Sequence, residues 1–187
     1  MLIDITLPVT KQMLKKDPGS QQATLLGHTG THFDVMHKDF PLEYTCRKGI
    51  VFDVSGVGER DIEIGDIAVE KIEPDMFVAF HTGYIEKIGY GEPGYFGNHP
   101  QLSETLIDLL LDKGVSIIAV DCAGIRRGSE HVPKDRYCAE RGTFVVENLC
   151  SLGEVLEHGG KFTAHTYPMR WEGVTGQPCR VIAETEE

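Results

Sequence analysis

Hydrophobic residues along the chain fall into short runs that glycine and proline interrupt. Alternating, β-branched runs predict strands, and a continuous apolar run that ends at a glycine predicts a buried strand. The 21 glycines and 9 prolines fit this interpretation, because they indicate many turns rather than a helical bundle. The predicted strands lie at residues 2–9, 49–57, 75–83, 115–122, 143–150, 161–169 and 179–184.

Two segments have the pattern of helices instead. In residues 102–114, Ser103 is a suitable N-cap, leucines form an apolar face and Gly114 ends the helix. Residues 151–159 predict a shorter helix. The class is therefore mixed α/β with a β-rich core and few helices, with one strand–helix–strand unit in the middle. The length predicts a single domain over residues 1–187.

The formal net charge of −11 argues against a nucleic-acid partner, because a polyanion would be repelled. No apolar run approaches the roughly 18 to 20 residues that a membrane span needs, and the N-terminus lacks the pattern of a signal peptide. The five cysteines form no CxxC pair, which favours reduced thiols and a cytoplasmic protein.

The sequence HTGTHFD at residues 28–34 places three possible metal ligands, His28, His32 and Asp34, at even spacing. On a straight strand these side chains would share a face, but positions 28 and 32 would lie about 13 Å apart. Ligands of one ion must converge, so we expect the chain to bend at Gly30. A surface turn is the alternative, although the apolar neighbours favour a buried segment that binds something.

This motif resembles the signature His-x-Gly-Thr-His-x-Asp-x-Pro-x-His of the cyclase family, which includes bacterial kynurenine formamidases and isatin hydrolases. Other segments are similar to family elements and occur in the family's order: LIDITLPV, HTGY, YFGNHPQLS, VSIIAVDCAG, VVENL and GQPCRVIA.

The resemblance implies a swivelling β/β/α-type domain with a mixed, barrel-like sheet. It further implies that His28, His32 and Asp34 bind Zn²⁺ or Mn²⁺, and that Glu147 ligates the same site; a carboxylate that caps the following helix is the alternative for Glu147. Imidazole and carboxylate ligands suit both metals. The implied activity is metal-dependent hydrolysis of a small amide, arylformamidase-like, and the implied assembly is a homo-oligomer.

Three departures from the family pattern affect these expectations. In the first, the family's third histidine, its acid or base, would fall at Lys38, and His37 comes one residue early. Either the loop is shorter and His37 still acts on the attacking water, or that role is lost, since a one-residue shift in an extended chain turns a side chain to the other face.

The second departure concerns a second metal ion. The two-metal members carry a histidine twelve residues before the glutamate, where this chain has Asp135, and the nearest histidine is His131. Either residue could complete a second site, or both could lie in a solvated charged loop. In the third departure, residues 10–22 lack the aromatic side chains expected to hold an aryl substrate, and the only tryptophan is Trp171.

Three functions remain open from the sequence. The first is hydrolysis of a small amide, cyclic amide or ester, in which the metal activates water and polarises a carbonyl while His37 moves the proton. The second is a metal-dependent lyase or dehydratase. The third is a metal-binding protein that has lost catalysis, and fold alone does not choose among them.

Overall fold

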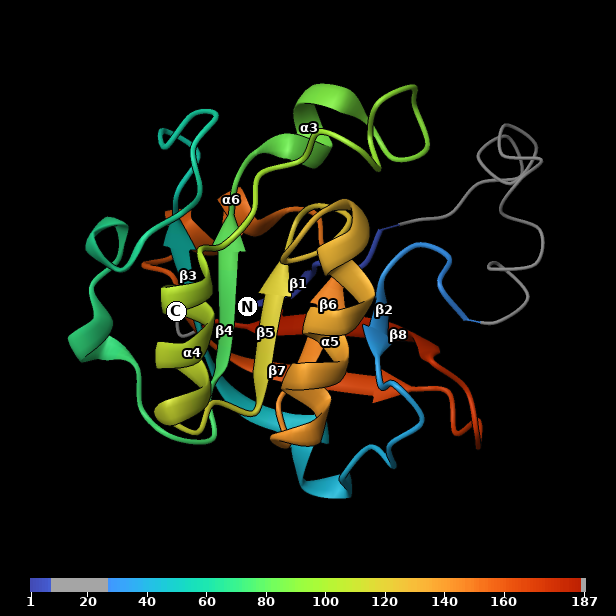
Figure 1. Cartoon of the computed structure of the whole chain (residues 1–187). Helices are drawn as coiled ribbons and strands as arrows, with labels where there is room; N and C mark the ends of the chain where they lie inside the picture. The colour runs from blue at the N-terminus through green and yellow to red at the C-terminus, as the bar shows by residue number, and fades with distance from the viewer. Residues whose placement is uncertain (8–26, 186–187) are drawn as a thin grey trace.

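The strands form one mixed sheet that closes on itself in the computed structural model, which describes residues 1–7 and 27–185 (Figure 1). Seven of the described strands form a barrel in the order β8-β2-β6-β5-β4-β3-β7, with β7 pairing back to β8, and β1 adds to β8 outside the ring. The strands are β1 (Leu2–Asp4), β2 (His32–Asp34), β3 (Cys46–Asp53), β4 (Phe77–His81), β5 (Ile117–Val120), β6 (Phe144–Glu147), β7 (Lys161–Pro168) and β8 (Gly176–Glu184).

Strands β3, β4, β5 and β6 run parallel, whereas β2, β7 and β8 pair antiparallel with their neighbours. The register between β2 and β6 places His32 directly opposite Glu147. Two residues that are 115 positions apart in sequence thus become neighbours through strand pairing alone. This pairing fixes one half of the candidate site.

The described chain also contains four α-helices: α3 (Tyr84–Ile88), α4 (Glu104–Asp112), α5 (His131–Glu140) and α6 (Leu152–Glu157). The N-cap of α4 is Ser103 as expected, since its Oγ accepts a hydrogen bond of 3.2 Å from the backbone N–H of Leu106. In Figure 1, α4 and α5 lie in front of β4, β5 and β6 and cover that side of the barrel.

The two larger hydrophobic cores lie inside the barrel and between the sheet and the helices. Along β5, Ile117 and Ala119 face the barrel interior, while Ile118 and Val120 belong to the core that α4 covers. Both faces of the strand are therefore buried, which explains its continuous apolar run. Leu106 and Leu110 of α4 are fully buried against this outer face, at about 1.5–3 kcal/mol of stabilisation for each side chain.

The mixed, barrel-like sheet with few helices is confirmed, and each predicted strand corresponds to an observed one. The first strand is shorter than expected: β1 ends at Asp4, and residues 8–9 and 10–22 lie outside the described residues. The alternative of a solvated charged loop at His131 and Asp135 is wrong, because this segment forms α5, with Pro133 in the first turn, where proline is tolerated.

All five cysteines are free thiols, as the spacing predicted. Within residues 1–7 and 27–185, no helix has both the length and the apolar character that a membrane crossing requires.

Candidate metal centre

The loop that ends in β2 brings His28 back toward His32 and Asp34. Gly30 has a φ of 66°, the left-handed conformation that glycine adopts without steric cost, so the predicted bend is confirmed. Phe33 packs inside the barrel, and because side chains alternate along a strand, His32 and Asp34 point to the outer face. That face of β2 lies under α5.

The side chains of His28, His32 and Asp34 converge in one group. Nδ1 of His28 lies 3.1 Å from Oδ1 of Asp34 and 3.1 Å from Nε2 of His32. Nε2 of His32 lies 3.7 Å from Oδ2 of Asp34. All three ligand atoms lie within 4.8 Å of one another, which is compatible with a shared cation.

The outer nitrogens of both imidazoles are held by other parts of the chain. Nδ1 of His32 lies 2.9 Å from the backbone oxygen of Gly30, and Nε2 of His28 lies 2.9 Å from Oγ1 of Thr175. With these contacts made, His32 directs Nε2 and His28 directs Nδ1 toward Asp34. Orientation of a ligand histidine through its other nitrogen is typical of metal sites. The contact from Thr175 could not be predicted from the sequence, because Thr175 lies 147 residues from His28.

A second group of ligand atoms shares Asp34 with the first. It consists of Asp34, His131, Asp135 and Glu147, again all within 4.8 Å of one another. Nε2 of His131 lies 2.8 Å from Oε1 of Glu147 and 3.2 Å from Oδ2 of Asp135. Both predicted candidates on α5 therefore reach the site.

Glu147 lies between the two groups rather than within the first. Its Oε1 contacts His131 at 2.8 Å, whereas its Oε2 lies 3.7 Å from Nε2 of His32. The family resemblance implied that Glu147 is a further ligand of the ion held by His28, His32 and Asp34. Its shorter contact is with His131 of α5, the helix that packs on both β6 and β2.

Three carboxylates are buried together at this centre. Asp34, Asp135 and Glu147 are 2%, 1% and 3% exposed, and like charges within 4.8 Å repel by about 3 kcal/mol per pair at an effective dielectric constant of ~20. Burial, and then the Asp34 carboxylate, raise the pKa of both Asp135 and Glu147 well above the usual range. Burial lowers the pKa of His32, but Asp34 and Glu147 outweigh this and raise it to about 9.

Several carboxylate oxygens at the centre accept no hydrogen bond. These are Oδ2 of Asp34 and both oxygens of Asp135, all buried. Such atoms are costly in a protein interior unless a ligand satisfies them. The donor set and its unsatisfied oxygens fit a divalent cation.

Solvent can reach the centre beside the imidazoles of His28 and His131. The side chains of His28 and His131 are 26% and 30% exposed, whereas the three carboxylate side chains are at most 4% exposed. Two glycines, Gly176 and Gly124, leave room for the ligand side chains. A Cβ at Gly176 would lie 2.7 Å from the His28 ring, and one at Gly124 would lie 3.1 Å from Oε1 of Glu147.

His37 is not part of either group. Its side chain is exposed, and Nδ1 lies 3.0 Å from the backbone oxygen of Gly173, between β7 and β8. Met36 and His37 both have positive φ, which turns the chain after β2. This geometry does not support the expectation that His37 reaches the attacking water, and its catalytic role stays a prediction.

Asp121, at the end of β5, holds a loop. Its carboxylate accepts hydrogen bonds from the backbone N–H groups of Thr82 and Gly83, and from the Thr82 hydroxyl. Burial raises its pKa to about 6, although these hydrogen bonds act in the opposite direction. His81, Glu86 and Asp121 form a third close group, but the carboxylate of Asp121 has its partners within the protein.

His99 is expected to make the stability of the protein dependent on pH. Its side chain is buried, Nδ1 lies 2.8 Å from the Pro100 oxygen, and burial lowers its pKa from 6.5 to about 4. Between these values the unfolded chain binds more protons, so stability falls as the pH drops below 6.5. At pH 5 the loss should be about 2 kcal/mol, at ~1.4 kcal/mol per pKa unit.

Urea unfolding of the full chain at pH 7.5 and pH 5, for His99→Gln beside the parent, measures this contribution. The variant should lose less stability on acidification, whereas His158→Gln, at an exposed histidine, should behave like the parent. Equal pH dependence in the His99→Gln variant and the parent would contradict the assignment.

Aromatic side chains approach the metal-binding loop from the segment after α3. The hydroxyl of Tyr90 accepts a 2.9 Å hydrogen bond from the backbone N–H of Gly30, and Tyr90 packs against Tyr95 and Phe96. Phe96 remains 50% exposed. This aromatic group was not predicted: aromatic side chains for the substrate were expected in residues 10–22, which lie outside the described residues.

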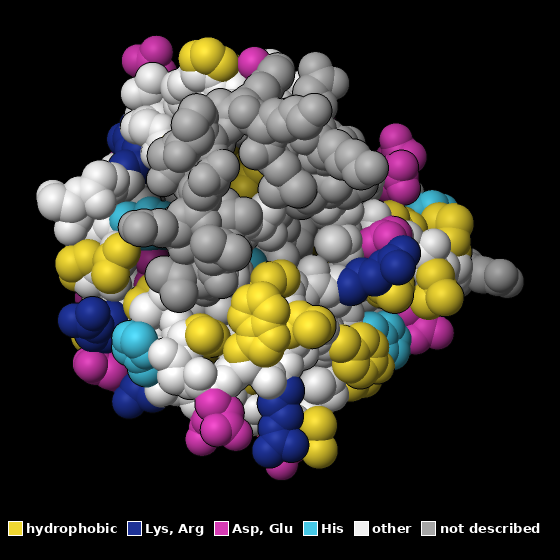
Figure 2. All heavy atoms as spheres, turned by 90° about the vertical axis from the view of Figure 1, so that its right-hand side faces the viewer, with side chains coloured by type: hydrophobic (Ala, Val, Ile, Leu, Met, Phe, Trp, Pro, Cys, Tyr) yellow, Lys and Arg dark blue, Asp and Glu magenta, His cyan; other side chains and the backbone are white. Residues whose placement is uncertain are grey.

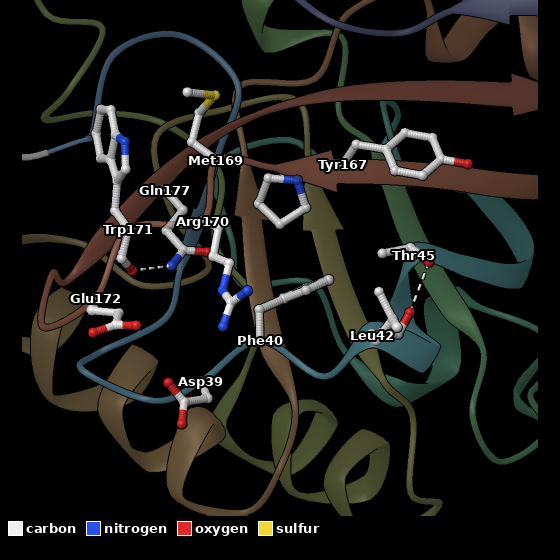
Figure 3. Close-up of a pocket in the computed structure, with 11 residues that line it drawn as sticks. Asp39, Phe40, Leu42, Thr45, Tyr167, Met169, Arg170, Trp171, Glu172 and Gln177 are labelled. Atoms are coloured by element: carbon white, nitrogen blue, oxygen red, sulfur yellow. Dashed lines mark hydrogen bonds between the residues drawn. The ribbon is translucent and has the colours of Figure 1, made fainter.

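A separate pocket of about 650 Å³ lies beside the β7–β8 hairpin (Figure 3). Trp171 lines it together with Phe40, Tyr167 and Met169, and its backbone oxygen accepts a 2.8 Å hydrogen bond from Gln177. None of the residues in the two metal-ligand groups lines this pocket. Figure 2, which views the side of Figure 1 where this hairpin projects, shows several groups of hydrophobic side chains with charged ones between them.

A family model described as "Putative cyclase" matches residues 3–126 of the chain. No curated protein matches the sequence. The family match covers His28, His32 and Asp34 but ends before α5.

Solved structures resemble the chain over its whole length. One, described as a potential metal-dependent hydrolase with cyclase activity, is 26% identical, covers 100% of this chain and 98% of its own, and has a TM-score of 0.80. A predicted metal-dependent hydrolase from Bacillus stearothermophilus is 23% identical over 98% and 97%, with a TM-score of 0.75. Isatin hydrolase A from Labrenzia aggregata, bound to benzyl benzoate, shares the fold at 18% identity over 100% and 94%, with a TM-score of 0.75.

Proposed function

Because the chain belongs to the cyclase family, we propose that it is a metal-dependent hydrolase of a small amide, cyclic amide or ester. The observation that carries the proposal is the convergence of His28, His32 and Asp34, with a buried Asp34 oxygen that has no hydrogen-bond partner. Two imidazoles and one carboxylate are a typical ligand set for Zn²⁺, and Mn²⁺ also suits these ligand types.

A divalent cation bound there would polarise a carbonyl oxygen and lower the pKa of a coordinated water. The protein's part is to direct the ligand nitrogens, through Gly30 and Thr175, and to surround the reacting region with buried groups. His131 and Glu147 are in contact at 2.8 Å, so a proton can be held between them beside the site.

The class of substrate is proposed from the relatives and from the aromatic group. One similar structure is an isatin hydrolase bound to the product analogue thioisatinate, at 20% identity and a TM-score of 0.69. Tyr90 contacts the loop that carries His28 through the backbone of Gly30, and Phe96 packs against Tyr90. Aromatic faces of this kind can stack on a flat ring. We therefore favour an aryl amide, such as a cyclic one or an aryl formamide.

Product analysis in ¹⁸O-labelled water tests the proposal. The full chain is depleted of metal with a chelator, reloaded with Zn²⁺ or Mn²⁺, and incubated with isatin, an N-formyl arylamine and an aryl ester. We expect metal-dependent cleavage of at least one compound, with one ¹⁸O atom in the new carboxylate or formate.

Each alternative function gives a different result in the same experiment. Metal-dependent turnover without incorporation of the label would contradict hydrolysis and favour a lyase. Binding of metal without turnover of any compound would contradict the proposed substrate class. The chelated protein is the matched control, because its chain is unchanged.

A further inference from the structure

A cleft of about 610 Å³ lies beyond the carboxyl ends of β3 and β4, and none of the residues in the two metal-ligand groups lines it. Figure 1 shows the segments that follow both strands at the same end of the sheet. Ligands commonly bind beyond the carboxyl ends of parallel strands. The charged side chains that line the cleft are Lys87, Arg127 and Glu59. Two cations thus face one acid, in a protein whose formal net charge is −11.

Arg127 is held in place without an acid partner. Its Nε donates a 3.1 Å hydrogen bond to Oε1 of Gln101, whose Nε2 in turn donates one of 2.8 Å to Oδ1 of Asp61. Arg127 forms no ion pair with a described residue, whereas the preceding Arg126 pairs with Asp61 and Glu130. The two terminal nitrogens of Arg127 can therefore bind a ligand, and a guanidinium fixed in this way suits a bidentate oxyanion.

His99 gives a separate indication that a ligand binds in the cleft, which it lines. Nδ1 lies 2.8 Å from the backbone oxygen of Pro100, which can only accept, so Nδ1 carries the proton. Burial lowers the pKa of His99 to about 4, so the ring is neutral at pH 7. Nε2 is then a bare acceptor, buried and without a hydrogen-bond partner among the described residues. Buried acceptors are rarely left unpaired, so a ligand should donate an N–H or O–H to it.

The charge of Arg127 acts on both rings that line the cleft. Burial raises the pKa of Tyr84, and the charge of Arg127 opposes this change. Burial lowers the pKa of His99, and the charge of Arg127 lowers it further. The Tyr84 ring is edge-on to His99, with 6.3 Å between the ring centres. Together with Val54 and Val57, Tyr84 gives the cleft an apolar surface beside its cations.

We propose that this cleft binds a small organic anion: a carboxylate held by Arg127 and Lys87, with a neighbouring hydroxyl or amine that donates to Nε2 of His99. The carboxylate accounts for two cations that form no ion pair with a described residue. The donor accounts for the unpartnered imidazole nitrogen, and the carbon skeleton lies against Tyr84. Because no metal ligand lines the cleft, the anion binds without a metal ion, and the site does not depend on the proposed hydrolysis.

Calorimetric titration of the metal-depleted full chain with mandelate and phenylacetate tests the proposal. The two carboxylates differ only in the hydroxyl of mandelate. We expect both to bind, and mandelate to bind about 2- to 10-fold more tightly, because its hydroxyl donates to His99. Arg127→Gln should weaken both by at least about 10-fold, since it removes charged hydrogen bonds. Arg136→Gln, at an exposed arginine of α5, is the matched control and should bind both like the parent.

Nuclear magnetic resonance follows the His99 ring without a substitution. In the ¹⁵N-labelled parent, the Nε2 resonance of His99 should shift when mandelate binds, because a bare nitrogen becomes hydrogen-bonded. Phenylacetate should leave this resonance close to its position in the free protein. Equal shifts with both acids, together with equal affinities, would contradict the role given to His99.

Other outcomes would overturn the site itself. One is that neither acid binds the metal-depleted parent. Binding that appears only after Zn²⁺ is added back would place the anion at the metal centre instead. Equal losses in Arg127→Gln and Arg136→Gln would show a nonspecific attraction of anions. Tighter binding of inorganic phosphate than of mandelate, lost in Arg127→Gln, would contradict the organic carboxylate. Circular dichroism of each variant establishes that it is folded.

Discussion

Replacing Asp34 by asparagine is expected to abolish metal binding at His28 and His32 and to reduce hydrolysis by more than about 100-fold. Asp34 is the one residue found in both ligand groups. Loss of a residue that merely orients a ligand typically costs 10–100-fold in metal affinity or activity, and loss of a shared ligand should cost more. Elemental analysis and the rate of product formation, measured on the same preparation, test this expectation.

Asparagine keeps the shape of Asp34, so the fold is expected to survive the substitution. It also removes one of three buried carboxylates that repel one another. Asp39→Asn is the matched control, since Asp39 is an exposed acid five residues later, in the segment after β2. Full metal content in Asp34→Asn would show that the buried group serves another purpose, whereas equal losses in both variants would show that the effect is not specific to the site.

The first ligand group could be predicted from the sequence because its members are local. His28, His32 and Asp34 lie within seven residues, and the requirement for a bend pointed to Gly30, which has the expected positive φ. The strands could also be predicted from the sequence. Runs such as residues 117–120 are apolar on both faces, because one face fills the barrel and the other packs under α4.

The second ligand group could not be derived in the same way. His131 and Asp135 share a face only if the segment is helical, but Pro133 and the many charged residues obscured the pattern of α5. This helix is stabilised by packing on β6 and β2 rather than by an apolar stripe of its own. Counting back from Glu147 identified Asp135, and only the helix explains why His131 reaches the same point.

The contacts that orient the ligands could not be predicted from the sequence either, because they join residues that are far apart in the chain. Thr175 meets His28 across 147 residues, and Asn148 meets Gly30 across 118. Strand pairing creates both contacts: β8 and β6 lie on either side of β2. A strand of three residues such as β2 has too short a pattern to predict which strands pair with it.

Replacing Asn148 by alanine is expected to lower both stability and metal affinity. Nδ2 of Asn148 donates a 2.9 Å hydrogen bond to the oxygen of Gly30, the same atom that Nδ1 of His32 contacts. Oδ1 accepts a 2.8 Å hydrogen bond from the buried hydroxyl of Tyr95. Asn148 thus holds in place the carbonyl that orients a predicted metal ligand.

Several costs combine in the Asn148→Ala variant. The Tyr95 hydroxyl loses its acceptor, at about 1–3 kcal/mol, and alanine at the observed φ of 58° costs roughly 1 kcal/mol more. We expect a loss of about 3 kcal/mol in the free energy of unfolding of the metal-depleted chain. Metal affinity should fall by about 10–100-fold, because the His32 ring is less firmly oriented. Urea unfolding and calorimetric titration measure the two effects separately.

Two further variants separate the causes. Asn148→Gly removes the side chain without the conformational penalty, so it should be more stable than Asn148→Ala but bind metal equally weakly. Tyr95→Phe removes the hydroxyl and leaves the Asn148–Gly30 hydrogen bond, so its metal affinity should stay close to that of the parent. If Asn148→Ala and Asn148→Gly both bound metal as tightly as the parent, the Gly30 carbonyl would not depend on Asn148. The short loop of Gly30 would then be rigid enough to direct His32 unaided.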